Sequence, residues 1–278
     1  MLGVVLVATS VSAQPGVALS VEGQLRQGDP LFVTVNGPAE SEGLRVRWDG
    51  HDYPVAPRKQ GAQSGAVVPI RVDLSAGGHL LQLLGQDSTT PLAQRTVTVH
   101  SRWFPNQTVT IPASTLASYD NPRNKADDEA ILACLRKDDP PNQLWTGPFR
   151  LPIQAPRTTM FGQKRVYNGW KKGWHKGTDL GGYEGQAIHA PAAGTVLQVA
   201  RGLVNGNTVV LGHGMGLGTV YLHMQRVNVK AGQQISKGQV IGWVGGTGGF
   251  APHLHWEARL YTVPIDPESL TQIPKDWQ

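Results

Sequence analysis

Cysteine is nearly absent from this 278-residue chain, which contains only Cys134 and therefore forms no disulfide bond within itself. Because Cys134 lies in the apolar stretch 131–135, we expect a buried, unreactive thiol. Charged residues are also scarce, at 16% of the chain, and no block of like charge exceeds a few residues. A net charge of +5 dispersed in this way gives no sign of a nucleic-acid-binding patch, although it suits an anionic surface such as a bacterial cell wall.

Long hydrophobic runs are missing as well, so no segment reaches the length of a transmembrane helix. A short apolar run at residues 2–8 is followed by Ser10-Val11-Ser12-Ala13, which is typical of a signal cleavage site. We interpret residues 1–13 as a secretory signal cut after Ala13, although no basic residues precede the apolar run; the alternative is a first β-strand. The mature protein is then expected to be secreted, periplasmic or in the cell envelope, without stable membrane insertion.

Residues 14–100 alternate between apolar and polar side chains with a period of two, which is typical of half-buried strands. The alternating stretches are 17–21, 31–35, 44–48, 66–72, 79–83 and 95–99. Turn sequences such as Gln27-Gly28-Asp29-Pro30 and Asp49-Gly50 separate them. This spacing predicts an immunoglobulin-like β-sandwich.

Residues 101–146 form a predicted connector with one helix. Pro122 followed by the acidic run 127–129 indicates a helix start, and Asp138-Asp139-Pro140-Pro141 would end it. From residue 147 the chain is rich in glycine and short strand patterns, without a strong helical period. We therefore predict an all-β protein with a short helical connector, a second β domain at 147–270 and a C-terminal tail at 271–278.

The sequence Pro252-His253-Leu254-His255 contains the most informative pattern in the chain. On a β-strand, residues i and i+2 point to the same face, so His253 and His255 would project side by side. Leu254 would then turn toward a core. Two imidazoles on one strand face indicate a polar site that other residues complete.

His175 and Asp179 are candidates to complete that site. On a straight strand their Cα atoms would be about 13 Å apart, too far for one metal ion. Gly177 between them argues against a helix and predicts a bent or bulged strand end. His175, Asp179 and one histidine of the 253/255 pair would give two nitrogens and one carboxylate, a ligand set that zinc accepts.

The order of these motifs resembles the lysostaphin/LytM-type zinc endopeptidases, the M23 peptidases of bacterial cell walls. The resemblance covers about residues 147–270. It includes Phe161-Gly162, His175-Lys176-Gly177-Thr178-Asp179, residues 190–196, residues 206–210, Tyr221-Leu222-His223, residues 238–242 and Pro252-His253-Leu254-His255. The sequence departs from the family pattern before Pro252, where the loop is one residue shorter and lacks the usual hydroxyl side chains.

The resemblance implies a fold, a site and a reaction. The fold would be an antiparallel β-sheet groove, and His175, Asp179 and His255 would hold Zn²⁺. His223 and His253 would be catalytic histidines without a metal bond, and either could be the general base. The substrate would be the peptide cross-links of peptidoglycan, and we expect a monomer. Aromatic candidates for the groove are Tyr167, Trp170, Trp174 and Trp243. In some relatives an N-terminal segment places an asparagine on the zinc, for which Asn121, Asn124 and Asn142 are the candidates.

Two other interpretations remain open at this point. A catalytically silent protein of the same fold could bind peptidoglycan or regulate other wall hydrolases, although such relatives lose ligands that are all present here. The hairpin pattern at residues 229–242 also occurs in biotinyl or lipoyl carrier domains. A carrier would have no use for two histidines on one strand face.

Overall fold

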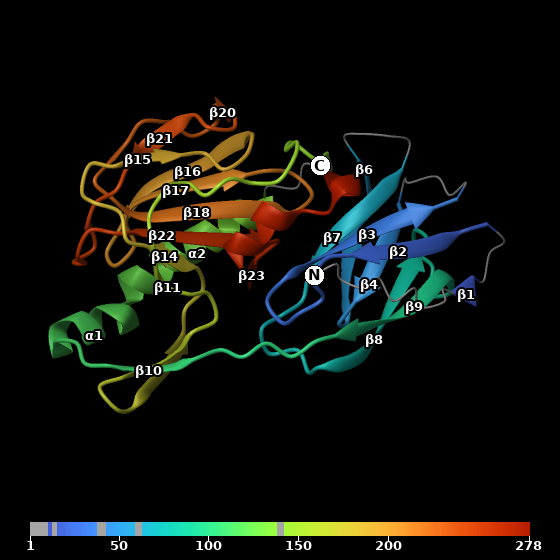
Figure 1. Ribbon diagram of the computed structural model, residues 1–278, viewed down its shortest axis with the longest axis horizontal. Helices are drawn as coiled ribbons and strands as arrows, with labels where there is room; N and C mark the ends of the chain where they lie inside the picture. The colour runs from blue at the N-terminus through green and yellow to red at the C-terminus, as the bar shows by residue number, and fades with distance from the viewer. Residues whose placement is uncertain (1–10, 13–15, 38–42, 59–62, 138–141) are drawn as a thin grey trace.

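The computed structural model describes residues 11–12, 16–37, 43–58, 63–137 and 142–278 (Figure 1). Strands dominate these residues, and the prediction of an all-β fold is confirmed. The predicted signal at residues 1–13 lies almost entirely outside them. Its two described residues form the short strand β1 (Val11–Ser12), which pairs with β9 (Pro91–Val99).

Two antiparallel sheets make up the N-terminal sandwich. One has the order β1-β9-β8-β4-β5 and the other β2-β3-β7-β6. The remaining bounds are β2 Ala18–Glu22, β3 Pro30–Asn36, β4 Arg45–Trp48, β5 His51–Pro54, β6 Ala56–Pro57, β7 Ser64–Pro69 and β8 Gly77–Leu84. The apolar side chains of both sheets share one core around the fully buried Trp48, whose indole Nε1 donates a hydrogen bond to the Pro69 carbonyl at 3.0 Å.

The connector contains two helices where the sequence predicted one. The predicted helix is α2 (Pro122–Lys137), and a shorter helix, α1 (Ala113–Asp120), precedes it. Asn121 separates them in an extended conformation, as expected for a residue before proline. The prediction missed α1 because Leu116 is its only buried residue, which leaves no apolar periodicity to recognise.

The C-terminal part is built on a sheet of eight strands (Figure 1). Its main order is β11-β14-β22-β18-β17-β16-β20, and β23 pairs with β22. The bounds are β11 Arg157–Thr159, β14 Thr178–Leu180, β16 Gly194–Gly202, β17 Gly206–Gly212, β18 Leu217–Met224, β20 Gln234–Ile235, β22 Leu254–Leu260 and β23 Val263–Ile265. All neighbouring strands of this sheet are antiparallel, as predicted.

Two three-stranded sheets flank the large one. β15 (Ala187–His189), β21 (Val240–Trp243) and β19 (Arg226–Val227) form the first. β10 (Asn106–Val109), β12 (Lys164–Tyr167) and β13 (Lys171–Trp174) form the second, in which the connector strand β10 runs parallel to β12. Residues 229–242 are therefore shared between two sheets of this part and do not form a separate carrier domain.

The two parts of the chain share an apolar cluster. Phe32 and Val67 of the sandwich lie in it together with Trp145 and Trp277. The rings of Phe32 and Trp277 are 5.3 Å apart, and Trp277 is 1% exposed. The segment predicted to be a tail thus helps to join the two parts, through the 3₁₀ helices η1 (Pro267–Gln272) and η2 (Lys275–Trp277). No helix in the described ranges combines the length and apolar character required to cross a bilayer.

Candidate metal centre

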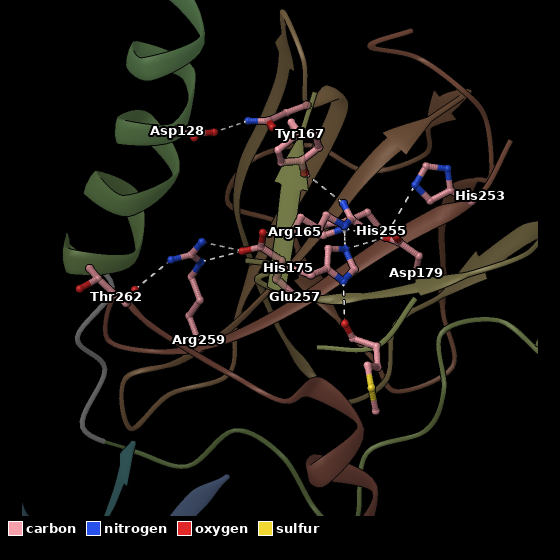
Figure 2. Close-up of polar contacts among 12 residues, drawn as sticks. Asp128, Arg165, Tyr167, His175, Asp179, His253, His255, Glu257, Arg259 and Thr262 are labelled. Atoms are coloured by element: carbon pink, nitrogen blue, oxygen red, sulfur yellow. Dashed lines mark hydrogen bonds and ion pairs between the residues drawn. The ribbon is translucent and has the colours of Figure 1, made fainter. Parts of the chain in front are cut away.

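Three buried side chains converge at one edge of the large sheet. His175 follows β13, Asp179 lies in β14 and His255 lies in β22 (Figure 2). The Asp179 Oδ1 atom is 3.0 Å from His175 Nε2 and 2.8 Å from His255 Nδ1, and the two nitrogens are 3.0 Å apart. In the part of the chain that the structure describes, no other group of three His, Cys, Asp or Glu residues converges in this way.

Local geometry explains how residues four apart in sequence reach one point. β13 ends at Trp174 and β14 begins at Thr178, so the chain turns between His175 and Asp179 as the sequence predicted. Gly177 is required in this turn, because a Cβ atom there would lie 2.4 Å from the Trp256 carbonyl oxygen. The backbone of the turn can therefore approach β22 closely enough to bring its ligands to His255.

Strand register decides which histidine of the 253/255 pair joins the set. His255 is the direct partner of Asp179 across the antiparallel pair β14–β22. His253 precedes β22, and its Nε2 atom lies 3.7 Å from Asp179 Oδ1. His255 is thus in contact with both other residues, while His253 lies beside them.

The hydrogen bonds around the two rings fit a metal site. His175 Nδ1 lies 3.0 Å from the Met160 carbonyl oxygen, and His255 Nε2 lies 3.1 Å from a carboxylate oxygen of Glu257. Because both partners are acceptors, these nitrogens carry the protons and donate. The opposite nitrogens then direct lone pairs at each other and at Asp179, which is unfavourable unless a positive charge lies among them. A divalent metal that takes nitrogen and oxygen ligands meets this requirement.

The electrostatics of the cluster also favour a positive charge. Burial alone would lower the pKa of His255, but the adjacent carboxylates of Asp179 and Glu257 raise it to about 9. Burial would raise the pKa of Asp179, but the adjacent rings of His175 and His255, which favour its charged form, hold it well below the ordinary value. In the absence of a metal, a proton on His255 can supply the charge that the three converging atoms need.

Two further histidines border the same pocket. His223, at the end of β18, has a positive φ of 63°, a strained conformation for a residue other than glycine. Its Nδ1 donates to the Thr247 carbonyl at 3.0 Å, and burial lowers its pKa to about 3, so the ring is neutral at neutral pH. The ring centroids of His223 and His253 are 4.9 Å apart. The candidate catalytic pair therefore faces the candidate ligands.

These residues line a cavity of about 250 Å³, which we call the metal pocket. Its walls come from β12 and β13 on one side, the connector helices on another and the loop around Phe250. Tyr167 and Trp174 lie in the wall as expected. Trp170 and Trp243 do not: Trp170 is 65% exposed outside the pocket, and the Trp243 ring packs under the Arg226 guanidinium at 3.3 Å.

The connector contributes Asn124 to the metal pocket. Asn124 is 5% exposed, and its Oδ1 atom has no hydrogen-bond partner among the residues that the structure describes. Asn121 and Asn142, the other candidates, are exposed and do not line the pocket. Asp127 and Asp128 hold the helix in place by accepting hydrogen bonds from the Leu203 backbone (2.7 Å) and the Asn205 side chain (2.9 Å).

Sequence reasoning missed two residues that contact the candidate ligands. Glu257 accepts from His255 and forms an ion pair with Arg259 at 2.7 Å. The sequence could have indicated Glu257, because His253, His255 and Glu257 occupy every second position and therefore share one face of a strand. Arg165 lies 3.4 Å from the second carboxylate oxygen of Asp179, and no local pattern identified it. Two other histidines of the C-terminal part, His189 and His213, lie outside the metal pocket.

A buried His-Asp-His set beside two further histidines, in a pocket of a β-sheet, has the donor atoms that a divalent metal ion requires. Residues 173–267 match peptidase family M23, so this segment of the chain contains an M23 peptidase domain. A crystal structure of a peptidase M23 from Pseudomonas aeruginosa is 26% identical and superposes with a TM-score of 0.67, covering 90% of this chain and 96% of that one. The likeness therefore extends over both parts of the chain.

Curated relatives match a shorter segment. An uncharacterized metalloprotease of Haemophilus influenzae is 41% identical over 95 residues, which is 34% of this chain and 20% of that protein. The peptidoglycan DD-endopeptidase ShyC of Vibrio cholerae is 38% identical over 102 residues, or 36% of this chain and 23% of ShyC. The matched segments thus span about a fifth of these relatives. The family match at residues 173–267 contains all five candidate site residues.

Proposed function

We propose that this protein is a secreted, zinc-dependent endopeptidase that hydrolyses the peptide cross-links of bacterial peptidoglycan in the cell envelope. The observation that carries the proposal is the convergence of His175, Asp179 and His255 within about 3 Å beside His223 and His253. The relatives that are described as peptidoglycan DD-endopeptidases support the choice of substrate.

His175, Asp179 and His255 would hold the zinc, whose ligand preferences this set meets. A zinc ion held there would supply Lewis-acid chemistry, namely polarisation of a peptide carbonyl and activation of a water molecule. The surrounding residues keep the ligands oriented: Met160 and Glu257 fix the tautomers of the two ligand rings.

His223 would accept the proton of the attacking water. Its Nδ1–H is held by the Thr247 carbonyl, so the Nε2 lone pair is the free one, and the lowered pKa keeps it unprotonated before the reaction. His253 donates its Nδ1–H to the Ala251 carbonyl at 2.8 Å and directs Nε2 toward Asp179. His253 would donate a hydrogen bond to the developing oxyanion or pass a proton to the leaving amine.

Two variants test these roles separately. We would measure zinc per chain and release of soluble fragments from purified peptidoglycan for the wild type, His255→Ala and His223→Ala. We expect about one zinc and lysis in the wild type, loss of both in His255→Ala, and retained zinc without lysis in His223→Ala. His189→Ala is the matched control, because His189 lies outside the metal pocket. A wild type without zinc would refute the proposal.

The alternative of a catalytically silent wall protein is not favoured. A regulator of this fold has no need to keep three converging ligands and two unliganded histidines in one pocket. Zinc binding without lysis of peptidoglycan from any source would nevertheless move the assignment to that alternative.

A further inference from the structure

A second, larger cavity lies where the sandwich, the connector and the C-terminal part meet. It measures about 900 Å³, which is within the size range of ligand sites. Gly173 and Trp174 of β13 line both this cavity and the metal pocket. Since His175 directly follows Trp174, the wall that the two cavities share ends next to a candidate metal ligand. We call it the junction cavity.

Trp103 is the most exposed large apolar side chain of the described residues, at 78%, and it lines the junction cavity. Its two neighbours are firmly held. Arg102 forms ion pairs with Asp29 at 3.3 Å and Asp266 at 2.5 Å, and Phe104 packs edge-on against Phe161 at 6.3 Å between ring centroids. The backbone at Trp103 is thus held in place on both sides, while its indole lies largely in solvent.

Polar groups without partners lie next to this indole. Asn106 and Lys164 are direct partners across the parallel pair β10–β12, and both line the junction cavity. Neither side chain forms a hydrogen bond or ion pair with any residue that the structure describes. The two arginines of the cavity, by contrast, are engaged by acids: Arg71 by Asp49 and Asp73, and Arg102 as above. Asn106 and Lys164 are therefore available to a ligand.

We propose that the junction cavity binds the glycan strand of peptidoglycan, a chain of acetamido sugars, while the attached peptide reaches the metal pocket past Trp174. A pyranose ring has an apolar C–H face and a polar edge. Trp103 offers a flat apolar surface for the face, and Asn106 and Lys164 offer donors and an acceptor for hydroxyl and acetamido groups at the edge.

The position of the junction cavity beside the metal pocket favours a glycan strand over an unrelated partner molecule. A cross-linked wall fragment carries its sugar chain and its peptide in one molecule, and the two cavities share two wall residues of β13, so they lie next to each other. The inference rests on the proposed function for the identity of the polymer. Its test therefore measures binding rather than hydrolysis.

The experiment is equilibrium binding of peptide-free glycan strands to the full chain, measured by calorimetry in the His223→Ala background so that no hydrolysis occurs. Trp103→Ala should weaken binding about tenfold, the effect of losing one aromatic contact. Lys164→Ala should also weaken it. Trp170→Ala, which removes a similarly exposed indole outside both cavities, should not.

The outcomes separate the two proposals. Glycan binding that depends on Trp103 supports the inference even if no peptide bond is cut. The inference is overturned if the protein lyses peptidoglycan but binds no glycan strands, or if Trp103→Ala binds them as tightly as the protein with Trp103. The proposed function stays intact in both cases. A third outcome is that Trp103→Ala weakens binding of sugar-free cross-linked peptides but not of glycan strands. The cavity would then be a peptide site, and the inference would be overturned.

Discussion

Replacement of Glu257 by glutamine should weaken metal binding although Glu257 touches no metal. Glu257 is 6% exposed on β22, two residues after His255, and its carboxylate accepts the His255 Nε2 proton at 3.1 Å. Glutamine keeps the shape of the side chain but loses its negative charge. That charge holds the proton on His255 Nε2 and makes the other ring nitrogen, Nδ1, more basic. Loss of such a supporting carboxylate typically lowers metal affinity about 10- to 100-fold.

The same substitution should also lower stability. The second carboxylate oxygen of Glu257 pairs with Arg259 at 2.7 Å, and Arg259 is 6% exposed. Removing one member of a buried ion pair costs about 3–5 kcal/mol. Because glutamine retains a hydrogen-bond acceptor, we expect the loss in free energy of unfolding to fall below that range. The Arg259 hydrogen bond to the Thr262 carbonyl, at 2.9 Å, would remain.

The assay is competition for zinc between the protein and a chelating indicator, with urea unfolding of the metal-free protein measured in parallel. Glu268→Gln is the matched control, since Glu268 also pairs with an arginine, Arg157, at 3.1 Å, but at the surface and away from the metal pocket. A zinc dissociation constant within twofold of the wild type in Glu257→Gln would show that this carboxylate does not orient His255, and the reasoning would be wrong.

Three further predictions concern the metal, the turn and the connector. Zinc at a hundred times its dissociation constant should stabilise the protein by about 2.7 kcal/mol, and a chelator should reverse the rise in melting temperature. Gly177→Ala should abolish zinc binding, because its Cβ would lie 2.4 Å from the Trp256 carbonyl oxygen, whereas Gly85→Ala, with no atom closer than 3.9 Å, should bind normally in the same titration. The double variant Asp127→Ala/Asp128→Ala should raise lytic activity by releasing the helix that walls the metal pocket; unchanged or lower activity with a reduced melting temperature would assign the helix a structural role only.

Local sequence patterns predicted the residues of the site better than their arrangement. The period of two placed His253 and His255 together, and Gly177 indicated the turn that joins His175 to Asp179. The choice between the two histidines needed the register of β14 against β22, strands about 75 residues apart in sequence. Local sequence patterns do not determine how strands so far apart pair, so the choice of His255 came from the family resemblance alone.

Long-range contacts, which local patterns do not determine, also explain the features around the site that the sequence analysis missed. Helix α1 was missed because its single buried residue, Leu116, gives no apolar stripe. Trp277 was placed in a tail because its partners, among them Phe32, come from the opposite end of the chain. Arg165 was overlooked because it meets Asp179 only through the fold of the β12–β13 hairpin.

The burial of Trp277 between the two parts has a consequence for how the protein folds. A cluster shared by both parts, with Arg58 over the Trp277 ring at 4.5 Å, couples their stabilities. We expect thermal unfolding in a single cooperative transition instead of two. A fragment lacking the sandwich would expose Trp145 and Trp277 to water, and it should aggregate when produced alone.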